Sequence, residues 1–280
     1  MRKTLIAVTL LCIPAIIMAS GGGAGETIIH HLLNADSWKP LWFLPAIPLP
    51  SITIGGVTIA VTAHSLMMLF ASIILATVFI VAFRNQALIP RGLAAAMEPA
   101  VMFVRNDIVY PAMGEELGRK WWPFFTTVFF FILTCNLMGL IPVFNTATGN
   151  VNVTAGLATM VLFLIFSGGI KSLGPWGFIK NMIPKGAPLP IGLIILVIEL
   201  LGFFIKAFAL CLRLFANMIA GHIVILALLV LIFILHPIAV AISVPLALFI
   251  NILELLVALI QALVFTLLSC IFVAMACHHH

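Results

Sequence analysis

Charged side chains are scarce in this sequence. Of its 280 residues only 8% are charged, 13 Lys and Arg with 8 Asp and Glu, whereas 64% are hydrophobic. Soluble domains carry about 25% charged and about 45–50% apolar residues, so this chain lacks the polar surface of a soluble fold. The same figures exclude intrinsic disorder, a collagen-like repeat and a disulfide scaffold. They predict an integral membrane protein with several helices.

Three further patterns are missing. The formal net charge of +5 is spread among loops without a basic patch, so we expect no nucleic-acid partner. The five cysteines lie in apolar runs without paired spacing, which favours small core residues over a disulfide or metal framework. No phosphate-binding loop of the G-x-x-x-x-G-K-[ST] kind occurs. The sequence therefore predicts neither a cofactor nor a metal site.

The first 63 residues indicate export. Two basic residues precede an apolar run over 5–18 and small residues follow, which predicts a signal peptide over 1–20. An uncleaved membrane helix is the alternative, but the run is short and Pro14 interrupts it. Residues 21–63 form the predicted external segment. Four prolines there disfavour a regular helix, and Gly55-Gly56 punctuates a short β-like stretch.

Residues 64–277 form the predicted membrane domain. Its first clear spans are 64–83, 121–142 and 151–166, close to the length that crosses a bilayer core. Residues 84–120 interleave charges with apolar residues at helical spacing, which predicts an amphipathic helix on the membrane surface.

The positions of basic residues predict the orientation. Residues 84–120 contain five Lys or Arg and residues 170–190 contain three, whereas 143–152 contains no charge. The positive-inside rule places the two basic segments in the cytoplasm and the uncharged one outside. We therefore expect an external N-terminus and a cytoplasmic C-terminus.

Two long apolar stretches, 191–235 and 238–277, make up the last third of the chain, with His236-Pro237 between them. As one helix the first would be about 67 Å long, about twice the bilayer core. Each stretch is either a hairpin of two spans or a single tilted helix. Without a proline or turn signal over 200–235, long tilted helices packed as an antiparallel hairpin are favoured. The predicted fold class is an all-α integral membrane protein with about five membrane helices and an amphipathic surface helix.

Ionisable side chains inside these stretches are costly, at about 2.5–3.5 kcal/mol each on insertion scales. The intramembrane polar residues are Glu199, Lys206, Arg213, His222, Glu254, Asn217, Asn251 and Gln261. For Glu199 and Lys206, snorkelling or a structural pair is a competing explanation. Arg213 lies at the midpoint of 191–235, where snorkelling is hardest.

Arg213 lies in a stripe of small and polar residues along one face of its predicted helix. At about 100° per residue, several small and polar residues fall within about 60° of Arg213. They are Glu199, Gly202, Lys206, Ala209, Ala216, Asn217 and Ala220. Because small residues allow another helix to approach closely, the stripe is a predicted contact surface with Arg213 at its centre.

Folding the two stretches back on each other predicts two sites. Arg213 then faces position 260, beside Gln261, while His222 faces Asn251 with Glu254 one turn away. A titrating His–Glu pair suits proton transfer.

Glu199 is a third predicted site on the proton path. It lies about 21 Å from Arg213 along the helix, on the cytoplasmic side. A guanidinium does not deprotonate in practice. Arg213 would therefore interrupt a proton path and attract any carboxylate brought past it.

The stretch LCLRLFANMIAGH (210–222) resembles the signature of subunit a of the F-type rotary ATP synthase. The resemblance covers about 64–277 and includes NLMGLIP (136–142), NVNVT (150–154) and LIQALVF (259–265). An Arg-Leu-x-small-Asn core with Glu fourteen residues upstream and Gln in the following helix is specific to that family.

The resemblance implies that Arg213 is the stator arginine facing the rotating c ring, where it releases the proton from each ring carboxylate and prevents leakage between two half-channels. Gln261 corresponds to the family glutamine beside it, and Asn217 to the motif asparagine. His222 and Glu254 match positions where many bacterial members carry Glu and His respectively, and the exchange is like that of mitochondrial-type members.

Further expectations follow from the resemblance. Glu199 would line the cytoplasmic half-channel, and Cys211, in place of a smaller family residue, would change only packing. The partners implied are the c ring, the peripheral-stalk b subunits, other synthase subunits and lipid. The chain would be non-catalytic by itself and reside in the bacterial inner membrane.

Alternatives remain at this stage. A secondary transporter with a midplane ionisable site is the main rival, although internal repeats and broken helices are not evident. A redox subunit would need His pairs at haem or metal spacing. Protons are favoured over sodium because His222 and Glu254 titrate, but the ion-binding carboxylate belongs to the ring. Residues 278–280 are assigned no role.

Overall fold

The computed structural model describes most of the chain after the N-terminal region. The described residues are 37–38, 47–48, 51–54, 57–60, 62–84, 90–141, 144, 146–184, 188–234 and 237–277. The predicted signal peptide, most of the predicted external segment and the terminal histidines lie outside them.

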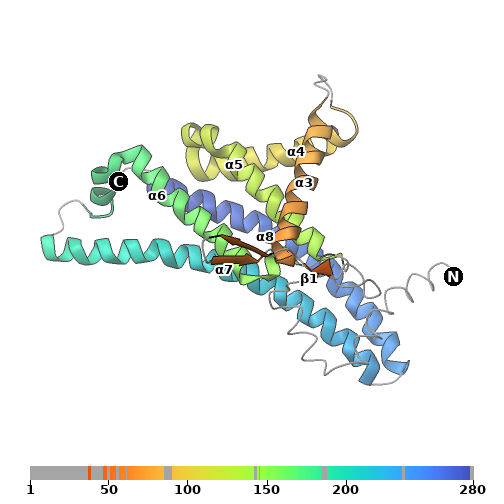
Figure 1. Ribbon diagram of the computed structural model, residues 1–280. Helices are drawn as coiled ribbons and strands as arrows, with labels where there is room; N and C mark the ends of the chain where they lie inside the picture. The colour runs from red at the N-terminus through yellow and green to blue at the C-terminus, as the bar shows by residue number, and fades with distance from the viewer. Residues whose placement is uncertain are drawn as a thin grey trace. The chain divides into compact units, whose positions relative to one another are not determined.

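Helices make up nearly all of this part of the chain (Figure 1). The α-helices are α3 (Ala63–Phe83), α4 (Leu93–Phe103), α5 (Tyr110–Gly139), α6 (Val151–Asn181), α7 (Leu189–Ile234) and α8 (Pro237–Cys277). A π-helix, η1 (Val104–Val109), joins α4 to α5, and a 3-10 turn, η2 (Ala147–Gly149), precedes α6. Within the described residues, five helical segments are long and apolar enough to cross a membrane. This confirms the predicted all-α membrane class.

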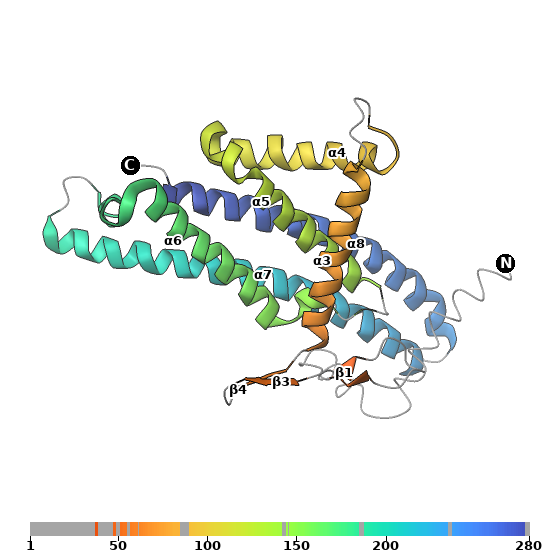
Figure 2. The same ribbon diagram turned by 45° about the horizontal axis from the view of Figure 1, so that its top comes forward.

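Two short β-hairpins precede α3, and Figure 2 shows their strands as arrows. Strand β1 (Ser37–Trp38) pairs antiparallel with β2 (Ile47–Pro48), and β3 (Ser51–Ile54) pairs with β4 (Val57–Ala60). In the second hairpin Ile54 lies opposite Val57. The predicted β-like stretch around Gly55-Gly56 is thus confirmed. The sequence did not predict that its two strands pair with each other.

The apolar helices differ from the predicted spans mainly at their ends. Helix α3 agrees with span 64–83 to within one residue. Helix α6 continues well beyond the predicted end at 166. Its extension packs closely, because a Cβ added at Gly168 would lie 3.2 Å from Cys277 Sγ. Packing against α8 therefore maintains a helix where the apolar run of the sequence has ended.

Helices α7 and α8 are long and continuous. They contain 46 and 41 residues, and 46 residues correspond to about 69 Å of helix. The long-helix interpretation is therefore correct and the double-hairpin one is wrong. A helix of this length exceeds the bilayer core about twofold, so it must tilt strongly to remain in the membrane.

The chain divides into two compact units. The first comprises Met1–Ala71, Cys135–Asn150 and Phe215–Leu259, and the second comprises Ser72–Thr134, Val151–Leu214 and Ile260–His280. Helices α3, α5, α7 and α8 each contribute one part to each unit. The predicted mid-membrane and external sites therefore belong to different units.

Aromatic and aliphatic side chains fill the core of the second unit. Phe125 of α5, Ile165 of α6, Leu214 of α7 and Phe265 of α8 are all completely buried in one cluster. Apolar residues of the predicted amphipathic segment 84–120 also contact this core, through Met97 and Val101 of α4. Tight van der Waals packing of this kind holds helices together where lipid offers no hydrophobic gain.

Two glycines bend helices in the second unit. Gly114 has φ 76° and ψ 167°, and Gly174 has φ 73° and ψ 164°. Only glycine adopts this region without strain. The sharp turn of the ribbon between α4 and the apolar part of α5 (Figure 2) lies at Gly114.

We predict that Gly114→Ala destabilises the protein by about 1–3 kcal/mol, because alanine would be forced into a glycine-only conformation. The measurement is the free energy of unfolding in mixed-detergent titration. Gly156→Ala is the matched control, since Gly156 has no positive φ and nothing within 4 Å of an added Cβ. Equal stability of the two variants would contradict the prediction.

Candidate functional site

Arg213 lies on an outward-facing side of α7 in the second unit. It is exposed, as are Ala209 and Ala216 on the same face, whereas Leu210 and Leu214 are buried in the core. No described residue forms an ion pair or hydrogen bond with its guanidinium. The structure therefore presents a permanent positive charge on an apolar helical surface.

The small residues of the predicted contact stripe leave space around this arginine. Ala209, Ala216 and Ala220 are exposed. A Cβ added at Gly202 would meet nothing within 4 Å. Asn217 is half-buried at the edge of the stripe. The face is thus shallow enough for another helix to approach Arg213 closely.

Lys206 and Glu199 form an ion pair two turns apart on α7, with Nζ 3.9 Å from Oε1. The ammonium also lies 5.0 Å from the ring centre of Phe203 and 5.7 Å from that of Phe272. The side chain of Lys206 is 25% exposed and that of Glu199 is 41% exposed. A partly solvated ion pair of this kind adds little to the stability of the protein. Stabilisation by the pair therefore does not explain on its own why two charged residues occur in an apolar helix.

Gln261 occupies a different environment from Arg213. It is 3% exposed on α8 and is followed by the core residues Ala262 and Phe265. The sequence predicted the two side chains next to each other. In the structure the glutamine is buried and the arginine is exposed, and their adjacency stays a prediction.

Glu254 carries a buried carboxyl group in the first unit, at 5% exposure. It packs against Gly221 of α7, where an added Cβ would lie 2.7 Å from Oε1 and 2.8 Å from Cδ. The predicted register placed position 252 opposite 221, and the Glu254 side chain reaches this glycine. The side chain of His222 lies outside the described part of the chain, and its predicted pairing with Glu254 stays a prediction.

Under the proton-translocating role that the sequence resemblance implies, we predict that Gly221→Ala lowers proton-coupled activity by up to about a hundredfold, because the new methyl group must displace the Glu254 carboxyl group. Misplacement of a reacting group by about 1 Å can cost that much. The measurement is the rate of proton-driven turnover in membrane vesicles, with Gly156→Ala as control. Unchanged turnover would show that the position of this carboxyl group is not critical.

Asn251 does not join this buried carboxyl group. It is exposed, and its Nδ2 donates to the carbonyl of Ala247 in its own helix at 3.2 Å. The sequence grouped Asn251 with His222 and Glu254 by folding the two apolar stretches back on each other, and the structure gives its amide a local acceptor.

Asn136 belongs to a buried polar cluster that sequence reasoning missed. Its Nδ2 donates to the carbonyl of Ala258 at 3.3 Å, and its Oδ1 accepts from Thr148 Oγ1 at 2.8 Å. Both polar side chains are completely buried. Ala258 lies one turn from Glu254, so Asn136 anchors α5 to α8 beside the buried carboxyl group. A lone Asn in the apolar run of α5 was the available signal.

The cysteines behave as core residues. All four described ones, Cys135, Cys211, Cys270 and Cys277, are buried. Cys211 packs with Ala158 and Ala207, and its Sγ lies 3.4 Å from Thr154 Oγ1, which agrees with the expected packing role. No group of three or more potential metal ligands occurs among the described residues.

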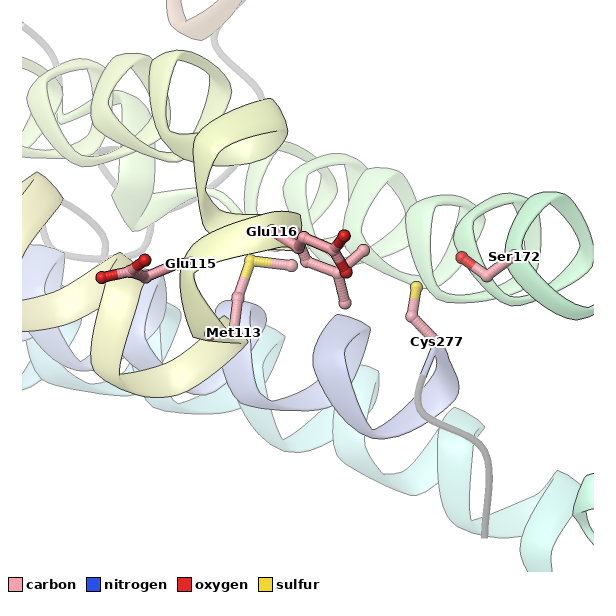
Figure 3. A pocket seen from close by; sticks show the side chains of 7 residues that line it. Met113, Glu115, Glu116, Ser172 and Cys277 are labelled. Atoms are coloured by element: carbon pink, nitrogen blue, oxygen red, sulfur yellow. The ribbon is translucent and has the colours of Figure 1, made fainter.

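A pocket of about 490 Å³ opens at the bend of α5 in the second unit (Figure 3). Its lining comes from α5, α6 and the end of α8: Met113, Gly114, Glu115, Glu116, Leu117, Ser172 and Cys277. In Figure 3 the Glu115 carboxylate points away from Ser172 and Cys277, and that of Glu116 lies nearer to them. None of the predicted site residues lines this pocket.

Comparison with known proteins places this arrangement in a family. Residues 65–274 match the family model described as ATP synthase A chain. ATP synthase subunit a of Myxococcus xanthus (strain DK1622) is 44% identical over 258 residues, covering 90% of this chain and 85% of the relative. ATP synthase subunit a of Chlorobium phaeobacteroides (strain BS1) is 41% identical over 267 residues, covering 92% and 78% respectively.

Proposed function

Because this chain belongs to the ATP synthase subunit a family, whose role is proton translocation in the membrane sector, we propose that Arg213 separates two offset proton half-channels within it. The observation that carries the proposal is the exposed Arg213 on an apolar face of the continuous helix α7. A charge in that position is expensive in lipid. A carboxylate presented by another subunit would compensate it.

The proposed partner at this face is the rotating ring of c subunits. Each ring carboxylate that reaches Arg213 would lose its proton, since the guanidinium favours the ionised form. The positive charge also repels a proton moving directly between the half-channels. The exposed alanines beside Arg213 support the proposal, because they allow a ring helix to come close.

The external half-channel is proposed to run past Glu254. Its carboxyl group is buried against Gly221 and lies one turn from the Asn136 anchor. We assign the proton relay to Glu254 and His222, with Asn217 and Gln261 as polar neighbours of the route. Asn251 is retained only as an outer polar residue because its amide donates to its own helix.

The cytoplasmic half-channel is proposed to begin at Glu199. The partial exposure of this side chain gives water access to it, and Lys206 compensates its charge.

Assembly and location follow from the same proposal. The chain would sit in the bacterial inner membrane with its N-terminus external, contact the peripheral-stalk b subunits and remain non-catalytic by itself. The rival transporter architecture uses discontinuous helices at its midplane site. Helix α7, which carries Glu199, Lys206 and Arg213, is unbroken, so the structure does not favour that rival.

The test is ATP-driven proton uptake by proteoliposomes that contain the complete complex. We expect acidification of the lumen, collapse of the gradient with a protonophore, and no sodium requirement. A complex assembled without this chain should hydrolyse ATP but fail to acidify. Full acidification without the chain, or uptake that depends on sodium and resists the protonophore, would overturn the proposal.

A further inference from the structure

Arg105 in the π-helix η1 has an unusual set of neighbours. Its Nε donates to Tyr110 Oη at 2.8 Å. Its guanidinium carbon lies 5.1 Å from the ring centre of Tyr110 and 5.4 Å from that of Trp122. The five-residue separation of Arg105 and Tyr110 fits the wider turn of a π-helix, a feature that is frequent at functional sites.

The two rings orient the guanidinium without neutralising it. Aromatic faces attract a cation through their quadrupole but carry no net charge. No described carboxylate forms an ion pair with Arg105. With Nε engaged by Tyr110, the two terminal nitrogens remain as a planar pair of donors, and Arg105 is only half-buried. Such a pair matches the oxygens of a phosphate group.

The residues around Arg105 indicate that its guanidinium lies near the boundary between the charged segment and the apolar membrane-spanning segment. Met102 and Phe103 immediately before it are 40% and 43% exposed. Trp122 lies just after the charged segment 115–120, within a run from Trp121 to Ile170 that contains no charged residue. Tryptophan is enriched at the boundary of the membrane, where the phosphates of lipid headgroups also lie.

We propose that Arg105 binds the phosphate of an anionic membrane phospholipid, with Tyr110 and Trp122 holding the guanidinium in the orientation that presents two donors. A lipid at this position would anchor η1 and the start of α5 at the membrane surface. The site is independent of the proton path, because no residue of that path contributes to it.

The test compares Arg105→Lys with Arg84→Lys in the complete complex. Lysine preserves charge but loses the planar fork. Arg84 is an exposed arginine without an aromatic ring, ion pair or hydrogen bond among the described residues. Native mass spectrometry would measure retained phosphatidylglycerol and phosphatidylcholine supplied in equal amounts. We expect Arg105→Lys to retain phosphatidylglycerol about fivefold less well, the effect of about one basic contact at a membrane surface, and Arg84→Lys to match the wild type.

A second measurement distinguishes a lipid site from a structural cap. Because a ligand of the native state raises thermal stability, added phosphatidylglycerol should raise the Tm of the wild type and Arg84→Lys more than that of Arg105→Lys. Equal retention and equal Tm shifts in all three proteins would overturn the proposal. Retention of phosphatidylcholine by the wild type equal to that of phosphatidylglycerol would also overturn it. Displacement of the lipid by millimolar inorganic phosphate would overturn it as well, because it would identify a soluble ligand.

Discussion

Replacing Arg213 with alanine should abolish proton-driven ATP synthesis in membrane vesicles. The ring carboxylate would then keep its proton as it passes α7, because the charge that favours its ionised form is gone. The barrier between the half-channels would vanish with it. We therefore expect no measurable synthesis together with a raised passive proton leak, recorded as a faster decay of an imposed pH gradient.

Arg84→Ala is the matched control for this experiment. It removes one exposed arginine from the same chain but from outside the proposed proton path, and synthesis should be close to wild type. The membrane content of the complex must be equal in the two variants. Coupled synthesis retained by Arg213→Ala would remove the basis for the stator assignment.

Glu254→Gln should reduce synthesis by about a hundredfold or more, which is the range that a positioned proton donor or acceptor contributes. Glutamine has nearly the same shape, so packing against Gly221 is retained while the titrating proton is lost. The initial rate of synthesis under an imposed pH gradient is the measurement. ATP hydrolysis by the detached catalytic part should be unaffected.

Ser269→Ala provides the control for a lost polar atom in α8. Ser269 is buried, and its hydroxyl donates to the carbonyl of Phe265 in its own helix at 2.7 Å. The exchange variant His222→Glu/Glu254→His keeps one acid and one imidazole. We expect the exchange variant to recover part of the synthesis lost in Glu254→Gln.

Wild-type rates of synthesis in Glu254→Gln would contradict the prediction, because they would show that protons do not pass through this carboxyl group.

Fold class and the long helices were predictable because they depend on composition and local pattern. An uninterrupted apolar run can satisfy its backbone hydrogen bonds in lipid only as a helix or a closed barrel. The absence of proline over 200–235 was therefore enough to anticipate α7. The bends at Gly114 and Gly174 were not anticipated, because a glycine within a helical pattern has no distinct signal until the chain must turn there.

The candidate residues were also visible early, because an ionisable group in an apolar run is costly wherever it occurs. Arg213, Glu199 and Glu254 could be selected on that ground alone. Their neighbours could not. The contact of Glu254 with Gly221, and the hydrogen bond from Asn136 to the carbonyl of Ala258, depend on how side chains of separate helices fit together.

The sequence by itself determined a membrane protein with five spanning helices, a family and a short set of charged residues. Only the tertiary structure decided that Arg213 is exposed while Gln261 is buried. It also decided that Lys206 lies over two phenylalanine rings and that Arg105 lies over the rings of Tyr110 and Trp122. The physical reason is that solvation cost and helical period act along one segment. Register, burial and the partner of a charge arise from contacts between segments far apart in the chain.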